Sequence, residues 1–214
     1  MRKPLSAFIS LVLFCWIQCP AAGDAEYEAD VCVYGGTASG VMAAVAAAKE
    51  GGTAIIVEPS RWLGGMTGGG ISELDWGRTQ AVGGSTYGIL KGEPGNEVYR
   101  SLFKDLIEKH DIQVIFDHRL GKVLRNGTTI RSIYLDFAPV DQAGCPIPEA
   151  ITSDAATVRA KVFIDCSYEG DLMAKSGVSY TWGRESIEQY GELLAGVRPN
   201  LWVYDIDPYI EPVG

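Results

Sequence analysis

The sequence predicts an α/β protein built on a doubly wound, largely parallel sheet. An apolar run at Asp30–Tyr34 is followed by a glycine turn, a helix of small residues and a second apolar run at Thr53–Val57. Two strands that are apolar on both faces and separated by a helix are typical of a parallel βαβ unit. A second strand, turn and helix follow at Val162–Asp171, and such an edge borders the cofactor in a doubly wound sheet.

Composition and charge exclude several classes of protein. Of the 214 residues, 47% are apolar, 21% are charged and 26 are glycine, as in globular proteins and unlike disordered, collagen-like or coiled-coil chains. The formal net charge is −9, and the sequence has no basic run. We therefore expect no nucleic-acid partner, because binding to a phosphate backbone needs clustered basic side chains.

The first 23 residues are predicted to be a secretory signal peptide. Arg2 and Lys3 form a charged start, Leu5–Ile17 is apolar, and Pro20–Gly23 supplies the residues for a cleavage site. The apolar stretch is shorter than the roughly 20 residues that a spanning helix needs. We expect export to the periplasm or the extracellular space, with no membrane span after cleavage. An uncleaved anchor is the alternative.

Three cysteines lie outside this segment, at Cys32, Cys145 and Cys166. This number is too low for a disulfide scaffold. No pair of them has the spacing of zinc ligands, so no metal site is expected. Cys32 and Cys166 fall in apolar, strand-like runs and are expected to be small core residues.

Between Gly40 and His110 the sequence predicts mainly helices and loops. A helix at Gly40–Glu50 ends at Gly51-Gly52, since glycine favours helix C-termini. A glycine-rich loop covers Pro59–Gly84, and residues 85–95 show no clear element. Apolar side chains of Asn96–His110 share one face, which indicates an amphipathic helix.

The second half is dominated by strand signals. Asn126-Gly127 is a strong signal for a two-residue hairpin turn. A short helix is predicted within Tyr168–Ser176, and a last helix at Ser186–Leu194. The predicted strands are Gln113–Phe116, Leu120–Leu124, Thr128–Leu135, Thr157–Ala160 and Lys161–Asp165.

The first motif with chemical content is Gly35–Gly40, between the first strand and the first helix. It follows the dinucleotide pattern G-x-G-x-x-G, except that Thr37 stands where the second glycine belongs. Gly35 permits a tight turn and Gly40 permits close packing, so that N–H groups at the helix start meet a pyrophosphate. The Thr37 hydroxyl could donate to phosphate as well. The alternative is an ordinary glycine-rich turn.

Two further motifs lie near the end of the second strand. Glu58 stands 23 residues after Gly35, where an acid can hold both ribose hydroxyls and would repel a 2′-phosphate. The alternative is a solvated charge at a strand end. The loop Arg61–Gly70 then carries five glycines within residues 64–70. Such a loop lets backbone approach a ligand closely, although a flexible surface loop is the alternative.

Five segments occur together in this chain: DVCVYGGTASGVMAAVAAAKEGG, IIVEP, RWLGGMTGGG, VFIDCSYEGDLMAKSGVSY and WGRESIEQYGELLAGV. Together they resemble the FAD-dependent oxidoreductase family with a glutathione-reductase-like FAD domain. More specifically, they look like a bacterial exported branch of it. The resemblance covers about Ala29 to Gly214, nearly everything after the predicted signal peptide.

The resemblance implies an FAD cofactor and the residues that hold it. Glu58, followed by Pro59, would bind the adenosine ribose, and the hairpin near Leu120 would approach the adenine. The strand end Asp165, Cys166 and Ser167 matches the family pattern, with Cys166 in place of the usual alanine. The pyrophosphate would be held by Gly35, Gly36, Thr37, Ala38, Ser39 and Gly40. The pyrophosphate and flavin side would be lined by Arg61, Gly64, Gly65, Met66 and Thr67.

The resemblance also implies a domain organisation. A signal peptide at 1–23 precedes a Rossmann-like, doubly wound FAD-binding domain at 24–180 with a β-meander insertion, and a substrate domain starts at 181–214. Family members are longer and carry a later Gly-Asp segment that contacts the flavin. No such segment follows Gly170-Asp171 here. We therefore expect an N-terminal fragment whose FAD domain is discontinuous and lacks its C-terminal part.

An acid–base group near the flavin is expected, because a flavin carries the hydride or electron chemistry while protein groups orient and tune it. The candidates are Glu73 and Asp75, after the glycine loop, and Arg184 and Glu185, after a strand-like run. Ordinary loop carboxylates and a structural ion pair are the alternatives. The expected partner is a small organic substrate.

Two other functions fit part of the pattern. An NAD-binding dehydrogenase domain would share the first βαβ unit and Glu58. The glycine loop at 64–70 and the segment 162–171 favour FAD, because a plain NAD domain does not need them. A non-catalytic Rossmann-like binding module remains the third interpretation, because Thr37 departs from the glycine pattern.

Overall fold

The computed structural model describes residues 25–71, 78, 81–90, 95–149, 152–193 and 195–196. The chain divides into two compact units, of which the first ends at Val178 and the second begins at Ser179. The boundary predicted from the sequence, after residue 180, lies two residues later. The predicted signal peptide falls outside the described residues.

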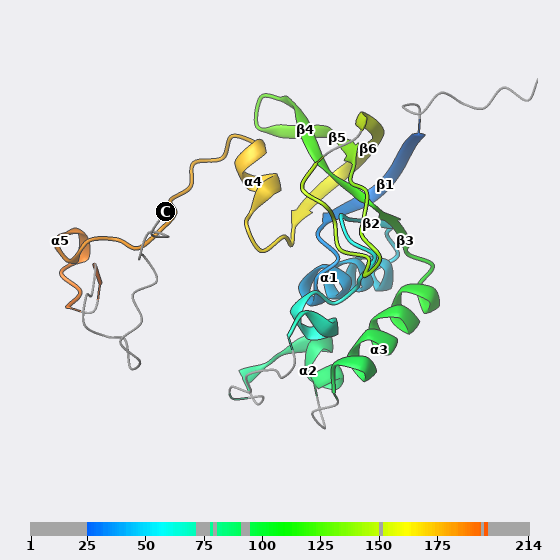
Figure 1. Cartoon of the computed structure of the whole chain (residues 1–214), viewed down its shortest axis with the longest axis horizontal. Coiled ribbons are helices and arrows are strands. Elements are labelled where there is room, and N and C mark those ends of the chain that lie inside the picture. The colour runs from blue at the N-terminus through cyan, green and yellow to red at the C-terminus, as the bar shows by residue number, and fades with distance from the viewer. Residues whose placement is uncertain are drawn as a thin grey trace, which may run out of the picture. The chain divides into compact units, whose positions relative to one another are not determined.

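One mixed sheet of six strands organises the first unit (Figure 1). Its order is β3-β2-β1-β6-β5-β4. The strands β1, β2, β3 and β6 run parallel, and β5 pairs antiparallel with both β6 and β4. This architecture confirms the α/β class. The strands are β1 (Ala25–Tyr34), β2 (Ala54–Glu58), β3 (Gln113–Phe116), β4 (His118–Asn126), β5 (Thr129–Phe137) and β6 (Thr152–Asp165).

The strand β6 joins the parallel and the antiparallel parts of the sheet. It pairs with β1 from Ala156 to Asp165 and with β5 from Thr152 to Arg159. The prediction of two separate strands, at Thr157–Ala160 and Lys161–Asp165, is therefore wrong. Ala160 and Lys161 are consecutive residues with no glycine or proline beside them. Pairing with β1 on both sides of this position keeps the backbone extended.

The helices are α1 (Ala38–Lys49), the π-helix η1 (Met66–Gly70), α2 (Gly84–Leu90), α3 (Asn96–Lys109), α4 (Asp171–Lys175) and, in the second unit, α5 (Ile187–Tyr190). Within the described residues, none of these is long and apolar enough to cross a membrane. The α3 helix confirms the prediction from its apolar face. The α2 helix was missed because its two glycines and its threonine lower helix propensity.

Two boundaries differ from the prediction. The last helix, predicted at Ser186–Leu194, forms one turn only, because Gly191 takes φ 69° directly after Tyr190. The hairpin turn is shifted by one residue, since Asn126 pairs with Thr129 and leaves Gly127-Thr128 as the connection. Gly127 takes φ 61°, a conformation that glycine adopts without strain.

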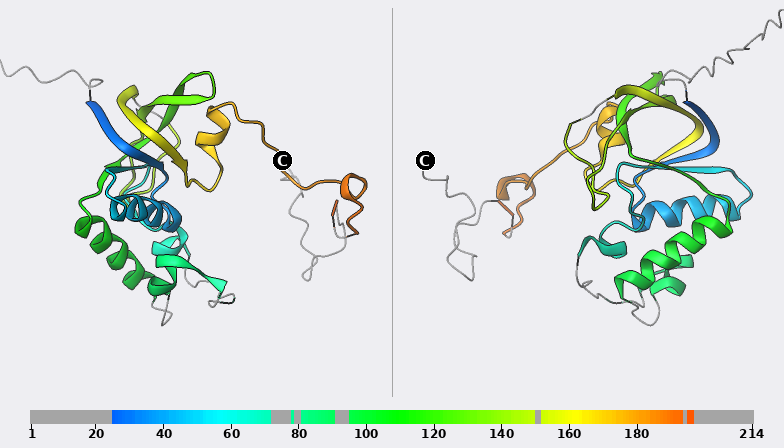
Figure 2. Two further views of the ribbon diagram at one scale, coloured as in Figure 1. Left: turned by 180° about the vertical axis from the view of Figure 1, so that it is seen from behind. Right: turned by 45° about the vertical axis from the view of Figure 1, so that its right-hand side comes forward.

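Two apolar clusters cover the two faces of the parallel strands. On one face α1 and α3 pack through Val41, Val45 and Phe103 against Val33 and Ile56. Figure 2 shows both helices on this side of the sheet. The other face is covered by the antiparallel strands and α4, whose buried side chains include Leu120, Ile133, Leu135, Val158 and Leu172.

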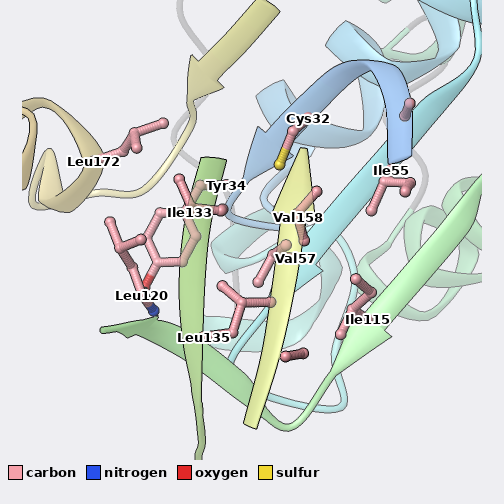
Figure 3. Packing of buried hydrophobic residues seen from close by; sticks show 12 residues of the cluster. Cys32, Tyr34, Ile55, Val57, Ile115, Leu120, Ile133, Leu135, Val158 and Leu172 are labelled. Carbon is pink, nitrogen blue, oxygen red and sulfur yellow. Dashed lines mark hydrogen bonds between the residues drawn. The ribbon is translucent and has the colours of Figure 1, made fainter. Parts of the chain in front are cut away.

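Tyr34 links the end of β1 to the antiparallel strands. Its hydroxyl accepts the backbone N–H of Leu120 at 3.2 Å, as Figure 3 shows among the buried side chains. Burial raises the pKa of Tyr34 to about 12, so the phenol stays protonated. Leu120 is itself 1% exposed, and Lys175 Nζ donates to its carbonyl oxygen. This hydrogen bond therefore ties β4, at one edge of the sheet, to the last residue of β1.

Asp30 connects three segments near the start of β2, at the end of the parallel strands away from the glycine turn. One oxygen of its carboxylate accepts the N–H and the hydroxyl of Thr53 at 2.8 and 2.9 Å, and the other accepts Lys161 Nζ at 2.6 Å. These hydrogen bonds, first the one from Lys161, hold the pKa of Asp30 well below its usual range. The carboxylate thus joins β1 to β6 and to the residue before β2.

We predict that Asp30→Asn lowers the stability of the fold in a pH-dependent way. Because the folded-state pKa is depressed, the contribution of the carboxylate is present above the unfolded pKa, near 4, and is lost as pH falls toward the folded value. Urea midpoints of wild type and variant should differ most at neutral pH, and the difference should start to shrink only below about pH 4. Asp105→Asn, on the exposed side of α3, is the control. A gap that stays constant with pH would contradict the role of Asp30.

Candidate nucleotide-binding site

The turn after β1 brings three loops together at the carboxyl edge of the parallel strands. Gly35 takes φ 99°, and its N–H donates to Val57 O of β2 at 2.9 Å. Cys166, after β6, donates its N–H to Tyr34 O at 2.8 Å. The ends of β1, β2 and β6 are therefore hydrogen-bonded to one another at the point where α1 begins.

Thr37 is the N-cap of α1. Its hydroxyl oxygen accepts the N–H of Gly40 at 3.2 Å, and the hydroxyl donates to Cys166 O at 2.9 Å. The single hydroxyl proton is thereby directed at the residue after β6, so a phosphate would be met by backbone N–H groups. The N–H groups of Ala38 and Ser39, in the first turn, have no acceptor within the helix and lie at its positive end.

Gly40 determines how closely α1 approaches β1. A Cβ atom at this position would lie 1.9 Å from the carbonyl oxygen of Gly35 and 3.3 Å from Cys166 Cβ. No side chain fits between the helix and the turn. The helix start can therefore sit directly on the strand end, as a pyrophosphate cradle requires.

Glu58, at the end of β2, is 9% exposed and bonds to both neighbouring loops. Oε2 accepts the N–H of Gly36 at 2.6 Å, and Oε1 accepts the N–H and the hydroxyl of Ser60 at 2.8 and 2.6 Å. Half-buried Pro59 lies between these two residues. A carboxylate offers about four acceptor positions, so one position on Oε2 remains for a ribose hydroxyl.

The glycine loop packs along the same turn. Gly64 donates its N–H to Gly36 O at 2.8 Å, and it lies so close to Phe103 that a Cβ atom would be 2.5 Å from the ring. Met66 donates its N–H to the hydroxyl of Tyr168 at 2.8 Å. Gly65 and Thr67 flank Met66, half-buried. The loop thus forms a second wall beside the start of α1.

Arg61 points away from the start of α1. Its guanidinium forms a two-pronged pair with the carboxylate of Asp117, with N–O distances of 2.9 to 3.2 Å. The pair raises the pKa of Arg61, mainly through these hydrogen bonds. The side chain borders a hollow of about 270 Å³, which is also lined by Trp62, Arg100 and the turn Asp141–Gly144.

The strand end after β6 forms a rigid turn. Asp165 Oδ1 accepts the N–H and the hydroxyl of Ser167, and Oδ2 accepts the N–H of Met173 at 2.8 Å. The Ser167 hydroxyl accepts the N–H groups of Gly170 and Asp171, each at 3.0 Å. Cys166 is half-buried, and burial raises the pKa of its thiol. These residues hold the backbone of Cys166 against the glycine turn.

The structure tests the remaining predicted residues only in part. Leu120 is a core residue whose N–H and carbonyl groups are both hydrogen-bonded. Glu73 and Asp75 lie outside the described residues. Arg184 and Glu185 belong to the second unit, where Glu185 O accepts the N–H of Gly196 at 2.9 Å.

Sequence reasoning missed two residues that the structure brings to the site. Ser60 orients Glu58, and Tyr168 reaches from the turn after β6 to the glycine loop. Ser60 could have been found from its place two residues after the acid, because serine in such turns bonds to neighbouring groups. No pattern in the sequence pairs Tyr168 with Met66, which stands 102 residues earlier.

A glycine turn, a capped helix start and an acid at the end of the adjacent strand define a dinucleotide-binding protein of the Rossmann-like class. The backbone is closely packed around this turn, because a Cβ atom on Gly36, Gly40 or Gly65 would lie 3.0 Å or less from another protein atom. The chain belongs to the FAD-dependent oxidoreductase family, whose model matches residues 30–212. FAD is therefore the cofactor of this chain.

Several solved structures are similar to this chain at low sequence identity. A triple mutant of the flavin-dependent brominase Bmp2 is 13% identical with a TM-score of 0.50, over 73% of this chain and 43% of that one. THI4 of Thermovibrio ammonificans is 20% identical with a TM-score of 0.46, over 71% and 64%. The thioredoxin reductase of T. acidophilum is 18% identical with a TM-score of 0.43, over 64% and 34%. The chain thus spans less than two thirds of each protein. No curated protein sequence matches it.

We predict that Gly40→Ala destabilises the first unit by about 3 kcal/mol, because the methyl group would overlap the backbone of Gly35. Gly88→Ala is the matched control, since it also lies in a helix and its Cβ atom would meet nothing within 4 Å. That control should be neutral or slightly stabilising, as alanine favours helix over glycine. Urea unfolding of both variants measures the difference. If the two variants were equally stable, the proposed role of Gly40 in packing α1 against the turn would be contradicted.

Proposed function

We propose that the chain is the nucleotide-binding part of an exported flavoenzyme that transfers hydride or electrons between FAD and a small organic substrate. The observation that carries this proposal is the cradle formed by Gly36, the start of α1 and Glu58. When bound, the flavin supplies the redox chemistry. The residues of the chain bind the cofactor and orient it.

Each wall of the cradle has its own role in the proposal. The N–H groups of Ala38 and Ser39 would receive the pyrophosphate at the positive end of α1. The free position on Glu58 Oε2 would accept a ribose hydroxyl, and its charge would exclude a 2′-phosphate. The backbone of Gly64–Thr67 would border the cofactor on the other side. No residue among those described is assigned the acid–base step.

Export is supported by the sequence of residues 1–23, with its basic start, apolar middle and small residues before Asp24. Mass spectrometry of the protein recovered outside the cytosol tests this. A mature chain beginning between Ala22 and Glu26 supports export. A chain that keeps Met1 and stays in the cytosol contradicts it.

The two other functions make different demands on the same site. An NAD-binding dehydrogenase domain would need the turn at Gly35–Gly40 and Glu58, but not the glycine loop that packs on Gly36. A non-catalytic module would need no cofactor at all. The bond from Gly64 to Gly36 favours FAD, because it makes the glycine loop part of the cradle wall.

We predict that the purified chain retains FAD after addition of the cofactor and desalting, and that Glu58→Lys abolishes this retention. The lysine would replace an acceptor of three hydrogen bonds by a donor and reverse the charge at the ribose position. Visible absorbance of the desalted protein measures bound flavin. Glu50→Lys, an equal charge change at the exposed end of α1, should retain FAD.

Far-UV circular dichroism separates loss of binding from loss of fold in these variants. Glu58→Gln serves as a milder change, because it removes the charge and keeps one acceptor oxygen. A folded wild-type chain without flavin would favour the non-catalytic module, and retention of NAD in place of FAD would favour the dehydrogenase. Full retention by Glu58→Lys would overturn the placement of the ribose.

A further inference from the structure

Tyr168 connects the two walls of the cradle. It stands in the turn between β6 and α4, and its hydroxyl oxygen accepts the N–H of Met66 at 2.8 Å. The contact is close on the side of the loop as well, since a Cβ atom on Gly65 would lie 2.2 Å from this oxygen. The side chain is nevertheless 57% exposed. The phenol therefore reaches over open space and is not part of the core.

The contacts around Tyr168 close a ring about the start of α1. Gly64 N–H donates to Gly36 O at 2.8 Å, and Thr37 Oγ1 donates to Cys166 O at 2.9 Å. Chain neighbours complete the ring, from Gly64 to Met66 on one wall and from Cys166 to Tyr168 on the other. Two of the hydrogen bonds in this ring use a side-chain hydroxyl. Thr37 is buried, whereas Tyr168, which bonds to Met66, is exposed.

The chemistry of the phenol suits an anion in this place. A tyrosine hydroxyl accepts and donates at the same time, so accepting from Met66 leaves its proton for a second partner. Among the described residues no hydrogen bond uses that proton. A phosphate at the start of α1 carries acceptor oxygens only, and charge-assisted hydrogen bonds are stronger than neutral ones.

We propose that Tyr168 is a cofactor-binding residue whose hydroxyl donates to a phosphate oxygen of the dinucleotide while it accepts the N–H of Met66. This inference rests on the proposed function, because it takes the pyrophosphate to lie at the start of α1. Tyr168 then fixes the distance between the glycine loop and the β6–α4 turn and recognises the phosphate at the same time.

The test compares Tyr168→Phe with wild type by isothermal titration of FAD and of ADP, which contains the phosphates and lacks the flavin. Loss of a hydrogen bond to a charged group should raise Kd about tenfold for both ligands. Tyr134→Phe is the matched control, because Tyr134 lies on β5 and its ring stays available to Lys122 at 4.3 Å. Its Kd values should equal those of wild type.

The possible outcomes separate the two proposals. Wild type that binds FAD and ADP, with a variant that is unchanged for both, overturns the role of Tyr168 alone. Weaker binding of FAD with unchanged binding of ADP also overturns it, because the contact would then be to the flavin end. Wild type that binds neither ligand overturns the proposed function together with this inference. An unchanged melting temperature of Tyr168→Phe excludes a general loss of folding.

Discussion

The rest of the site depends on the close approach of α1 to the end of β1. Because Gly40 has no side chain, the first turn of the helix rests on the carbonyl of Gly35. Only at this separation can the Thr37 hydroxyl cap the helix and reach Cys166 O at the same time. These bonds are short-ranged, and an added methyl group would lengthen several of them together.

Glu58 holds the surrounding loops together and is also the residue that we propose as a ligand-binding group. Burial of a carboxylate is costly unless donors compensate it, and here Gly36 and Ser60 supply three of them. The same bonds hold the acid and the glycine turn in fixed positions before any ligand arrives. A site that is already ordered loses less conformational freedom on binding. The donors that compensate the charge of Glu58 thereby also order the proposed ribose-binding position.

The sequence predicts those features of the fold that depend on residues close to one another along the chain. The βαβ unit, the α3 helix and the glycine turn follow from short patterns of apolar residues and glycines. The single long β6 did not, because its continuity is set by pairing with β1 and β5 and not by its own residues. The same holds for Leu120, which is buried because β4 packs into the apolar cluster beside Tyr34. The pairing of Arg61 with Asp117, 56 residues apart, also depends on the fold and leaves no local signal.

The long strand β6 has a consequence for how this protein acquires its shape. Thr37 and Cys166 are 129 residues apart in the chain, so their bond closes one of the longest loops in the first unit. Contacts between such distant residues form slowly, because the entropy of loop closure opposes them until late. During synthesis the βαβ unit emerges from the ribosome long before β6. Until β6 follows, the open edge of β1 lacks its partner, and this period is when the nascent chain is most exposed to wrong strand pairing.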